Sequence, residues 1–105
     1  MRYIPYDLSH ILVEYYYDIS KGDDFMTAKE AVADRIISIC KERNIAVNAL
    51  ANMSGVSPST VYSMLNSKSQ NPGIVSLQKL CDGLDISLRD FFNDNIFENL
   101  EQEIK

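Results

Sequence analysis

The chain has no tryptophan, two cysteines and one histidine among its 105 residues. Cys40 and Cys81 lack the paired spacing of a zinc site or a disulfide framework, so we expect free, partly buried thiols. His10 belongs to no constellation of Asp, Ser or Cys and is assigned no chemistry. Because acid–base pairs, activated nucleophiles and phosphate-binding loops are also missing, the sequence predicts no metal, no cofactor and no enzymatic activity.

The chain also lacks a hydrophobic run long enough to cross a membrane, and it lacks the basic start, apolar core and cleavage site of a signal peptide. We therefore expect a cytoplasmic protein with no membrane partner. The apolar fraction of 46% is ordinary for a globular protein and argues against global disorder. A length of 105 residues fits one domain with additional segments at its ends.

Charged residues are unevenly distributed along the chain, whose net charge is −5. Residues 1–25 carry two positive and five negative side chains, and residues 95–105 carry one positive and three negative. Residues 26–94 carry seven of each sign. The acidity therefore lies in the flanking segments, and the neutral central segment predicts only modest electrostatic affinity for phosphate.

The central segment begins with signals for two helices. Thr27 and Glu30 have the spacing of a capping box, and Asn44 suits a helix end because it tolerates the left-handed conformation. A short second helix is expected over residues 47–54. Gly55 then allows a tight turn that a Cβ atom would hinder.

A third helix has the clearest start, because Ser57 is a favoured N-cap and Pro58 a favoured first residue. A fourth helix is expected over residues 74–83, and a fifth after a cap at Ser87. Apolar residues at helical spacing predict the inward-facing positions, which are Val32, Ile36, Ile39, Cys40, Leu50, Ala51, Val61, Met64 or Leu65, Leu77, Leu80, Cys81, Leu88, Phe91 and Phe92.

Both ends of the chain carry additional apolar residues. Residues 1–25 hold five of the six tyrosines and favour a helix, with a strand as the alternative because of their β-branched and aromatic content. Three roles for this segment remain open from the sequence: it docks on the central domain, it forms a dimer interface with the tail, or it is peripheral to function because the natural protein begins at Met26. Residues 95–105 form an acidic tail whose apolar residues recur at helical steps: Ile96, Phe97, Leu100 and Ile104.

The order helix, glycine turn, helix between residues 47 and 65 is that of a helix-turn-helix, whose second helix enters the DNA major groove. With the stretches ERNIAVNALANMSGVSPSTVYSMLNSKSQNP and SLQKLCDGLDISLRDFF, the chain resembles the phage-repressor-type (XRE, lambda-repressor-like) helix-turn-helix family. The resemblance, which extends from Val32 to Phe92, implies a compact five-helix lambda-repressor-like bundle. The predicted fold is therefore all-α, with this bundle in a DNA-binding domain over residues 26–94, an extra N-terminal segment and a short C-terminal helical tail. The resemblance also implies sequence-specific binding of double-stranded DNA by a homodimer.

Some positions depart from the family pattern. Val47 stands where many members have a Gln that binds a phosphate, and the neighbouring Asn48 can substitute for it. Pro58 replaces a long side chain that often reads a base. Ser67 replaces the glycine that usually ends the third helix, so that Asn66 or Ser67 must form this turn.

The resemblance places base-edge contacts at Ser59, Tyr62 and Ser63, which discriminate weakly because the first two turns of this helix lack Arg, Gln and Asn. Phosphate and sugar contacts are expected from the surrounding polar residues: Asn48, Ser57, Asn66, Lys68, Ser69, Gln70 and Asn71. Lys68 is the only full charge among them, which predicts a shallow dependence on salt. Each residue also has a structural alternative, as Tyr62 can simply cover an apolar patch.

The predicted function is therefore a DNA-binding transcriptional regulator, a repressor that acts as a homodimer without a small-molecule effector. The alternative is a protein-interaction module, antitoxin-like or an adaptor, that kept the fold and lost DNA binding. The acidic flanks, Val47 and the scarcity of Arg near the third helix favour this alternative.

Overall fold

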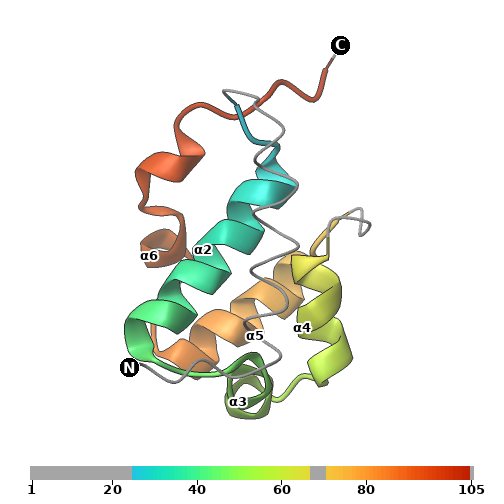
Figure 1. The fold of residues 1–105 in the computed structure, drawn as a ribbon, viewed down its shortest axis with the longest axis vertical. Coiled ribbons are helices and arrows are strands. Elements are labelled where there is room, and N and C mark those ends of the chain that lie inside the picture. The colour runs from blue at the N-terminus through green and yellow to red at the C-terminus, as the bar shows by residue number, and fades with distance from the viewer. Residues whose placement is uncertain (1–24, 67–70, 105) are drawn as a thin grey trace, which may run out of the picture.

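The computed structural model of the chain describes residues 25–66 and 71–104. Five α-helices and one 3-10 turn follow one another: α2 (Ala28–Arg43), α3 (Val47–Ser54), α4 (Pro58–Leu65), α5 (Ile74–Leu84), α6 (Leu88–Phe92) and η1 (Asn95–Phe97). Figure 1 shows α2 as the long central helix, with α6 on one side, α5 and α4 on the other, and α3 across one end. The predicted all-α bundle is confirmed, whereas the interpretation of residues 1–24 lies outside the described residues.

Three of the connections between helices share one design. Each starts with a residue in the left-handed conformation, namely Asn44 (φ 57°), Gly55 (φ 68°) and Asp85 (φ 60°). The next residue is aliphatic, and its N–H donates to the carbonyl oxygen five positions earlier: Ile45 to Cys40 at 3.0 Å, Val56 to Ala51 at 3.1 Å and Ile86 to Cys81 at 3.0 Å. This Schellman arrangement satisfies the last helical carbonyls, and the aliphatic side chain packs on the core.

Gly55 forms the tight turn that the sequence predicted, whereas Gly83 has a role that the sequence did not predict. A Cβ atom on Gly55 would meet nothing within 4 Å, so its positive φ, and not crowding, favours glycine there. Gly83 does not end its helix as expected, since α5 continues to Leu84. It lies against the end of α3, where an added Cβ would be 3.0 Å from the Cα atom of Ser54. Gly83 therefore permits the close approach of α3 and α5.

Residues from all five helices form one core. Val47 is fully buried, so the position that often binds a phosphate in the family serves packing here. Met64 and Leu65 are both buried. Phe91 is also buried, but Phe92 is 40% exposed and does not close the core as predicted. Phe92 instead contacts the ring of Phe97 in η1, with the two ring centres 5.0 Å apart.

The C-terminal tail is helical only in η1, a shorter helix than the apolar spacing predicted. Asp94 caps this single turn, accepting a backbone N–H two residues further on at 2.9 Å. Leu100 then pairs with Met26 in an isolated parallel bridge, and the N–H of Glu101 donates to the carbonyl oxygen of Met26 at 2.8 Å. These bonds to the segment before α2 need an extended backbone, and Ile104 is left 86% exposed.

Candidate DNA-binding surface

The start of α4 is built as its sequence predicted. The Ser57 hydroxyl accepts the N–H of Thr60 at 3.2 Å, and Pro58 occupies the first helical position. The Ser57 hydroxyl also lies 3.1 Å from that of Ser59 and 2.9 Å from that of Thr60. Ser57 is therefore a helix cap embedded in a small hydroxyl cluster at the exposed end of α4.

The outward face of α4 carries two of the three predicted base-edge residues. Ser59 and Ser63 are exposed and stand four residues apart, which places them on one side of the helix. Tyr62 is half-buried and packs against the core, so its ring covers apolar surface as well as offering an edge to solvent. The structure thus brings Ser59 and Ser63 together and sets Tyr62 partly apart from them.

An open hollow of about 380 Å³ lies between α4 and the start of α5. Its lining residues are Ser59, Thr60, Ser63, Met64, Asn71, Pro72, Gly73 and Ser76. Asn71, predicted to contact the DNA backbone, therefore lies at the same surface as the two exposed serines. Asn48 and Asn66 are also exposed, near the start of α3 and just after α4. The other predicted backbone contacts, Lys68, Ser69 and Gln70, lie outside the described residues.

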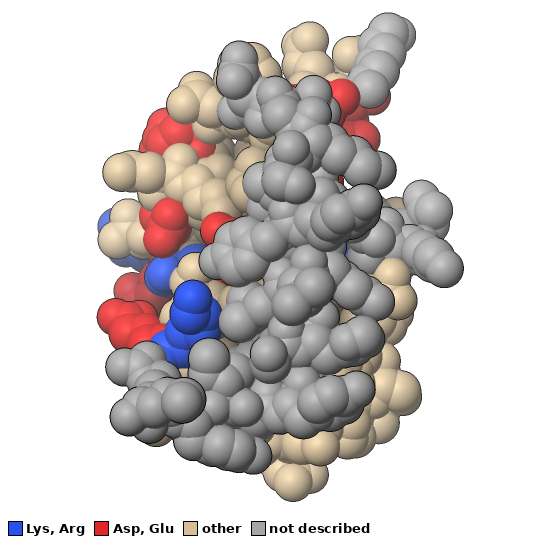
Figure 2. Space-filling model, in the orientation of Figure 1, with Lys and Arg blue, Asp and Glu red and all other residues tan. Residues whose placement is uncertain are grey.

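The helix-turn-helix is uncharged, since residues 44–67 contain no Lys, Arg, Asp or Glu. Figure 2 shows the consequence: acidic and basic side chains gather on the side of α6 and α2, whereas the edge formed by α3 and α4 is free of both colours. Polar groups on this edge are hydroxyls and amides. Such groups can form hydrogen bonds with DNA, but they give little of the electrostatic affinity that cations supply.

Three of the four basic residues of α2 contact the ends of other helices. Lys29 donates from Nζ to the carbonyl oxygen of Met64 at 2.9 Å and to that of Asn66, both at the end of α4. Arg43 donates from Nη1 to the carbonyl oxygen of Leu84, the last residue of α5, at 2.5 Å. Because the last carbonyls of a helix carry partial negative charge, each cation stabilises the helix end that it contacts.

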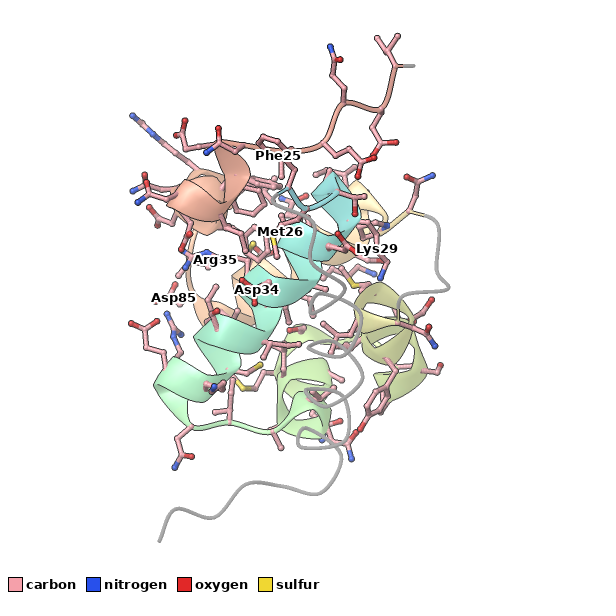
Figure 3. The ribbon with its side chains drawn as sticks, turned by 45° about the horizontal axis from the view of Figure 1, so that its top comes forward. Phe25, Met26, Lys29, Asp34, Arg35 and Asp85 are labelled. Atoms are coloured by element: carbon pink, nitrogen blue, oxygen red, sulfur yellow. The ribbon has the colours of Figure 1, made fainter. Side chains whose placement is uncertain are left out.

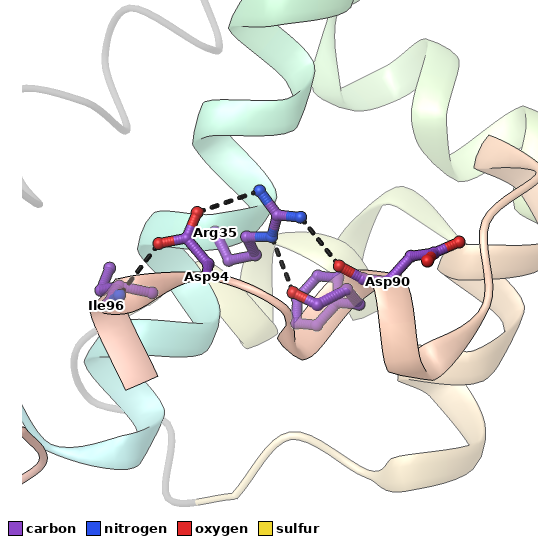
Figure 4. Close-up of polar contacts among 5 residues, drawn as sticks. Arg35, Asp90, Asp94 and Ile96 are labelled. Carbon is purple, nitrogen blue, oxygen red and sulfur yellow. Dashed lines mark hydrogen bonds and ion pairs between the residues drawn. The ribbon is translucent and has the colours of Figure 1, made fainter. Parts of the chain in front are cut away.

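Arg35 joins α2 to α6 and η1 in the same way (Figure 4). Its Nε donates to the carbonyl oxygen of Phe91 at 2.7 Å, and its Nη2 donates to that of Asp90 at 2.9 Å. Its Nη1 forms an ion pair with Asp94 at 3.2 Å. The guanidinium carbon also lies 5.9 Å from the centre of the Phe91 ring. Sequence reasoning missed Lys29, Arg35 and Arg43, because their partners lie 35 to 59 residues away.

Burial shifts the ionisation of three side chains. It lowers the pKa of Lys29 below its ordinary value, an effect that the neighbouring Glu30 carboxylate partly offsets. It raises the pKa of Cys40 to about 11 and also raises that of Cys81. Both cysteines are free and buried, as predicted.

Two further features of the described residues bear on function. Their His, Cys, Asp and Glu side chains form no group of three or more that could hold a metal ion. Among their helices, none combines the length and the apolar character needed to cross a membrane.

Comparison with known proteins identified a matching family model and a similar solved structure. Residues 35–95 match the family model of the Cro/C1-type helix-turn-helix DNA-binding domain. The crystal structure of the prophage Lp1 protein 11 is similar, with a TM-score of 0.62 and 31% sequence identity over 67% of this chain and 92% of that one. No match was found among curated proteins.

Proposed function

The chain belongs to the Cro/C1-type helix-turn-helix family of DNA-binding regulators, and we propose that it represses transcription by placing α4 in the major groove of duplex DNA. The observation that carries this proposal is the outward face of α4. Ser59 and Ser63 project from it, and Asn71 borders the same open hollow. The serines would contact base edges, and Asn71 would contact the sugar-phosphate backbone.

The chemistry of this face determines how the protein would discriminate among sequences. A serine hydroxyl can both donate and accept a hydrogen bond, so each serine can bind the edges of several different bases with similar energy. The exposed part of the Tyr62 ring would contact a thymine methyl group, or its hydroxyl would contact a phosphate. Each half-site therefore discriminates only weakly between DNA sequences. A homodimer on a two-fold site would bind two half-sites at once, which multiplies the preference for the correct sequence.

Backbone contacts would come from both sides of α4. Asn48 lies in the first turn of α3, and the exposed Asn66 and Asn71 stand in the sequence on either side of residues 67–70, which include Lys68. These contacts fix the register of α4 in the groove and carry no sequence information. We take residues 26–94 as the DNA-binding domain of a cytoplasmic regulator that needs no small-molecule effector.

One observation favours a second candidate function. The helix-turn-helix has no charge, and Lys29, Arg35 and Arg43 of α2 contact carbonyl oxygens of the protein itself. A surface of hydroxyls and amides also suits a protein partner, as in an antitoxin-like or adaptor module.

Selection of bound duplexes from a random DNA pool, at low and then physiological salt, separates the two functions. Enrichment of a two-fold site with half-sites about 34 Å apart, one helical turn, supports the dimeric repressor. Absence of enrichment at both salt concentrations refutes the base-edge roles of Ser59, Tyr62 and Ser63, and it leaves the protein-interaction module as the better proposal.

A further inference from the structure

The end of α4 is closed differently from the ends of α2, α3 and α5. Those three helices end at a residue with positive φ, whereas Asn66 after α4 is extended, with φ −79° and ψ 132°. The ammonium group of Lys29 donates to two carbonyl oxygens at this point, those of Met64 and Asn66. At the end of α4, a cation from another helix thus binds the last carbonyl oxygens, which a left-handed turn satisfies at the ends of α2, α3 and α5.

Lys29 is well placed to fix the end of α4. It lies in the first turn of α2, on the side that faces α4 (Figure 3). This turn is itself rigid, because Thr27 and Glu30 form a reciprocal capping box with hydrogen bonds of 2.9 and 3.1 Å. The side chain of Lys29 is half-buried, and its hydrogen bond to the Met64 carbonyl is partly shielded from solvent.

We propose that Lys29 is a positioning residue for DNA binding, which acts through α4 and does not touch the DNA. Holding the Met64 and Asn66 carbonyls sets where α4 ends and the direction in which the chain leaves toward Asn71. The inference rests on the proposed function, because the hollow between α4 and Asn71 is the proposed DNA surface. Lys29 lies outside residues 35–95, which match the family model, so the family match does not assign it this role.

The charge-removing variant Lys29→Met separates positioning from direct contact with a phosphate. A lysine that contacts a phosphate contributes about 0.9 to the slope of log K against log salt concentration, and its removal lowers that slope. A positioning lysine affects affinity without changing the slope. We therefore expect Lys29→Met to weaken binding about tenfold, which is about 1.4 kcal/mol, at an unchanged salt slope.

Two further variants complete the comparison. Lys29→Arg keeps the charge and the donors and should recover most of the affinity. Lys41→Met removes the same charge from the exposed end of α2, where the described residues show no side-chain hydrogen bond to α4. It measures the general effect of a lost positive charge, which we expect to be about twofold or less.

The experiment uses the full chain and a duplex selected from the random pool. Fluorescence anisotropy would give the affinity at four salt concentrations, at a temperature where circular dichroism shows each variant folded. Should Lys29→Met prevent folding, Lys29→Gln, which keeps a donor without the charge, replaces it in the comparison.

The outcomes separate the inference from the proposed function. Weaker binding at an unchanged salt slope, with recovery in Lys29→Arg, supports the positioning role. Unchanged affinity in a less stable Lys29→Met variant overturns it and leaves Lys29 a purely structural residue. A slope reduced by about 0.9 also overturns it, because Lys29 would then bind a phosphate. Failure of the unaltered chain to bind any duplex refutes the proposed function and, with it, the inference.

Discussion

The contact between Gly83 and the end of α3 yields the sharpest prediction of stability. A Cβ atom on Gly83 would lie 2.3 Å from the Ser54 hydroxyl oxygen, 3.0 Å from the Ser54 Cα atom and 3.1 Å from the carbonyl carbon of Met53. The hydroxyl can rotate away, but the two backbone atoms can move only with α3 itself. Gly83→Ala should therefore push α3 and α5 apart.

Two opposing effects set the magnitude for Gly83→Ala. Alanine gains about 1 kcal/mol over glycine inside a helix, whereas overpacking typically costs about 1–3 kcal/mol. Because backbone atoms are among the crowded neighbours, we take the upper part of that range and expect a net loss of about 1–2 kcal/mol. For a domain of this size each kcal/mol lowers the melting temperature by about 4–8 °C.

Urea and thermal unfolding, followed by circular dichroism at 222 nm, measure this loss. Ser54→Ala is the matched second variant, because the buried Ser54 hydroxyl has no hydrogen-bond partner among the described residues. Its removal should stabilise the protein by about 1 kcal/mol and relieve part of the clash in the double variant. An unchanged or higher stability of Gly83→Ala alone would refute the argument, since helix propensity would then outweigh the close approach.

The remaining predictions concern the turn, the α6 anchor and the buried thiol. Gly55→Ala, forced to a φ near 68°, should lose about 1 kcal/mol in urea unfolding, and Gly55→Asn should lose less. Arg35→Met should lower the free energy of unfolding by about 2–3 kcal/mol, because two hydrogen bonds to carbonyl oxygens and one ion pair are lost together. A change below about 0.5 kcal/mol would contradict this prediction. Burial raises the pKa of the Cys40 thiol from 9.0 to about 11. As the pH rises, the thiol therefore loses its proton at a lower pH in the unfolded chain than in the folded protein. The free energy of unfolding should therefore fall as the pH rises from 9 toward 11, by about 1 kcal/mol per unit, and Cys40→Ala should lack this part of the fall in urea titrations across that range.

Much of the bundle could be predicted because its helix boundaries have local causes. The capping box at Thr27, the Ser57–Pro58 start and the left-handed Asn44 each act within a few residues of the chain. The helix predicted over residues 74–83 stops one residue before the observed end at Leu84, because the left-handed cap at Asp85 was not identified. The close approach of Gly83 to α3 was also not predicted, since it depends on how two helices pack.

The candidate site was harder to predict than the fold. Helical spacing was enough to place Ser59 and Ser63 on one exposed face, but their proximity to Asn71 depends on how α5 packs beside α4. The partners of Lys29 and Arg35 could not be foreseen, because they are backbone carbonyls at the ends of distant helices. A sequence pattern shows no particular carbonyl as a binding group, since every residue has one.

The neutral helix-turn-helix implies binding driven by hydrogen bonds and fit more than by charge. With residues 44–67 uncharged, few counterions would be released when the complex forms. Affinity would then fall only slowly as salt rises, in contrast to a regulator with a basic recognition helix.

The most direct test of the central claim places one carboxylate on the outward face of α4. Ser59→Glu adds a negative charge in the first turn, where the helix dipole favours it, so the fold should be as stable or more so. Ser38→Glu adds the same charge at an exposed position of α2 and serves as the control. Affinity for the selected duplex should fall at least tenfold, or about 1.4 kcal/mol, in Ser59→Glu and stay within about twofold in Ser38→Glu. Equal affinity in the two variants would contradict the placement of α4 against DNA.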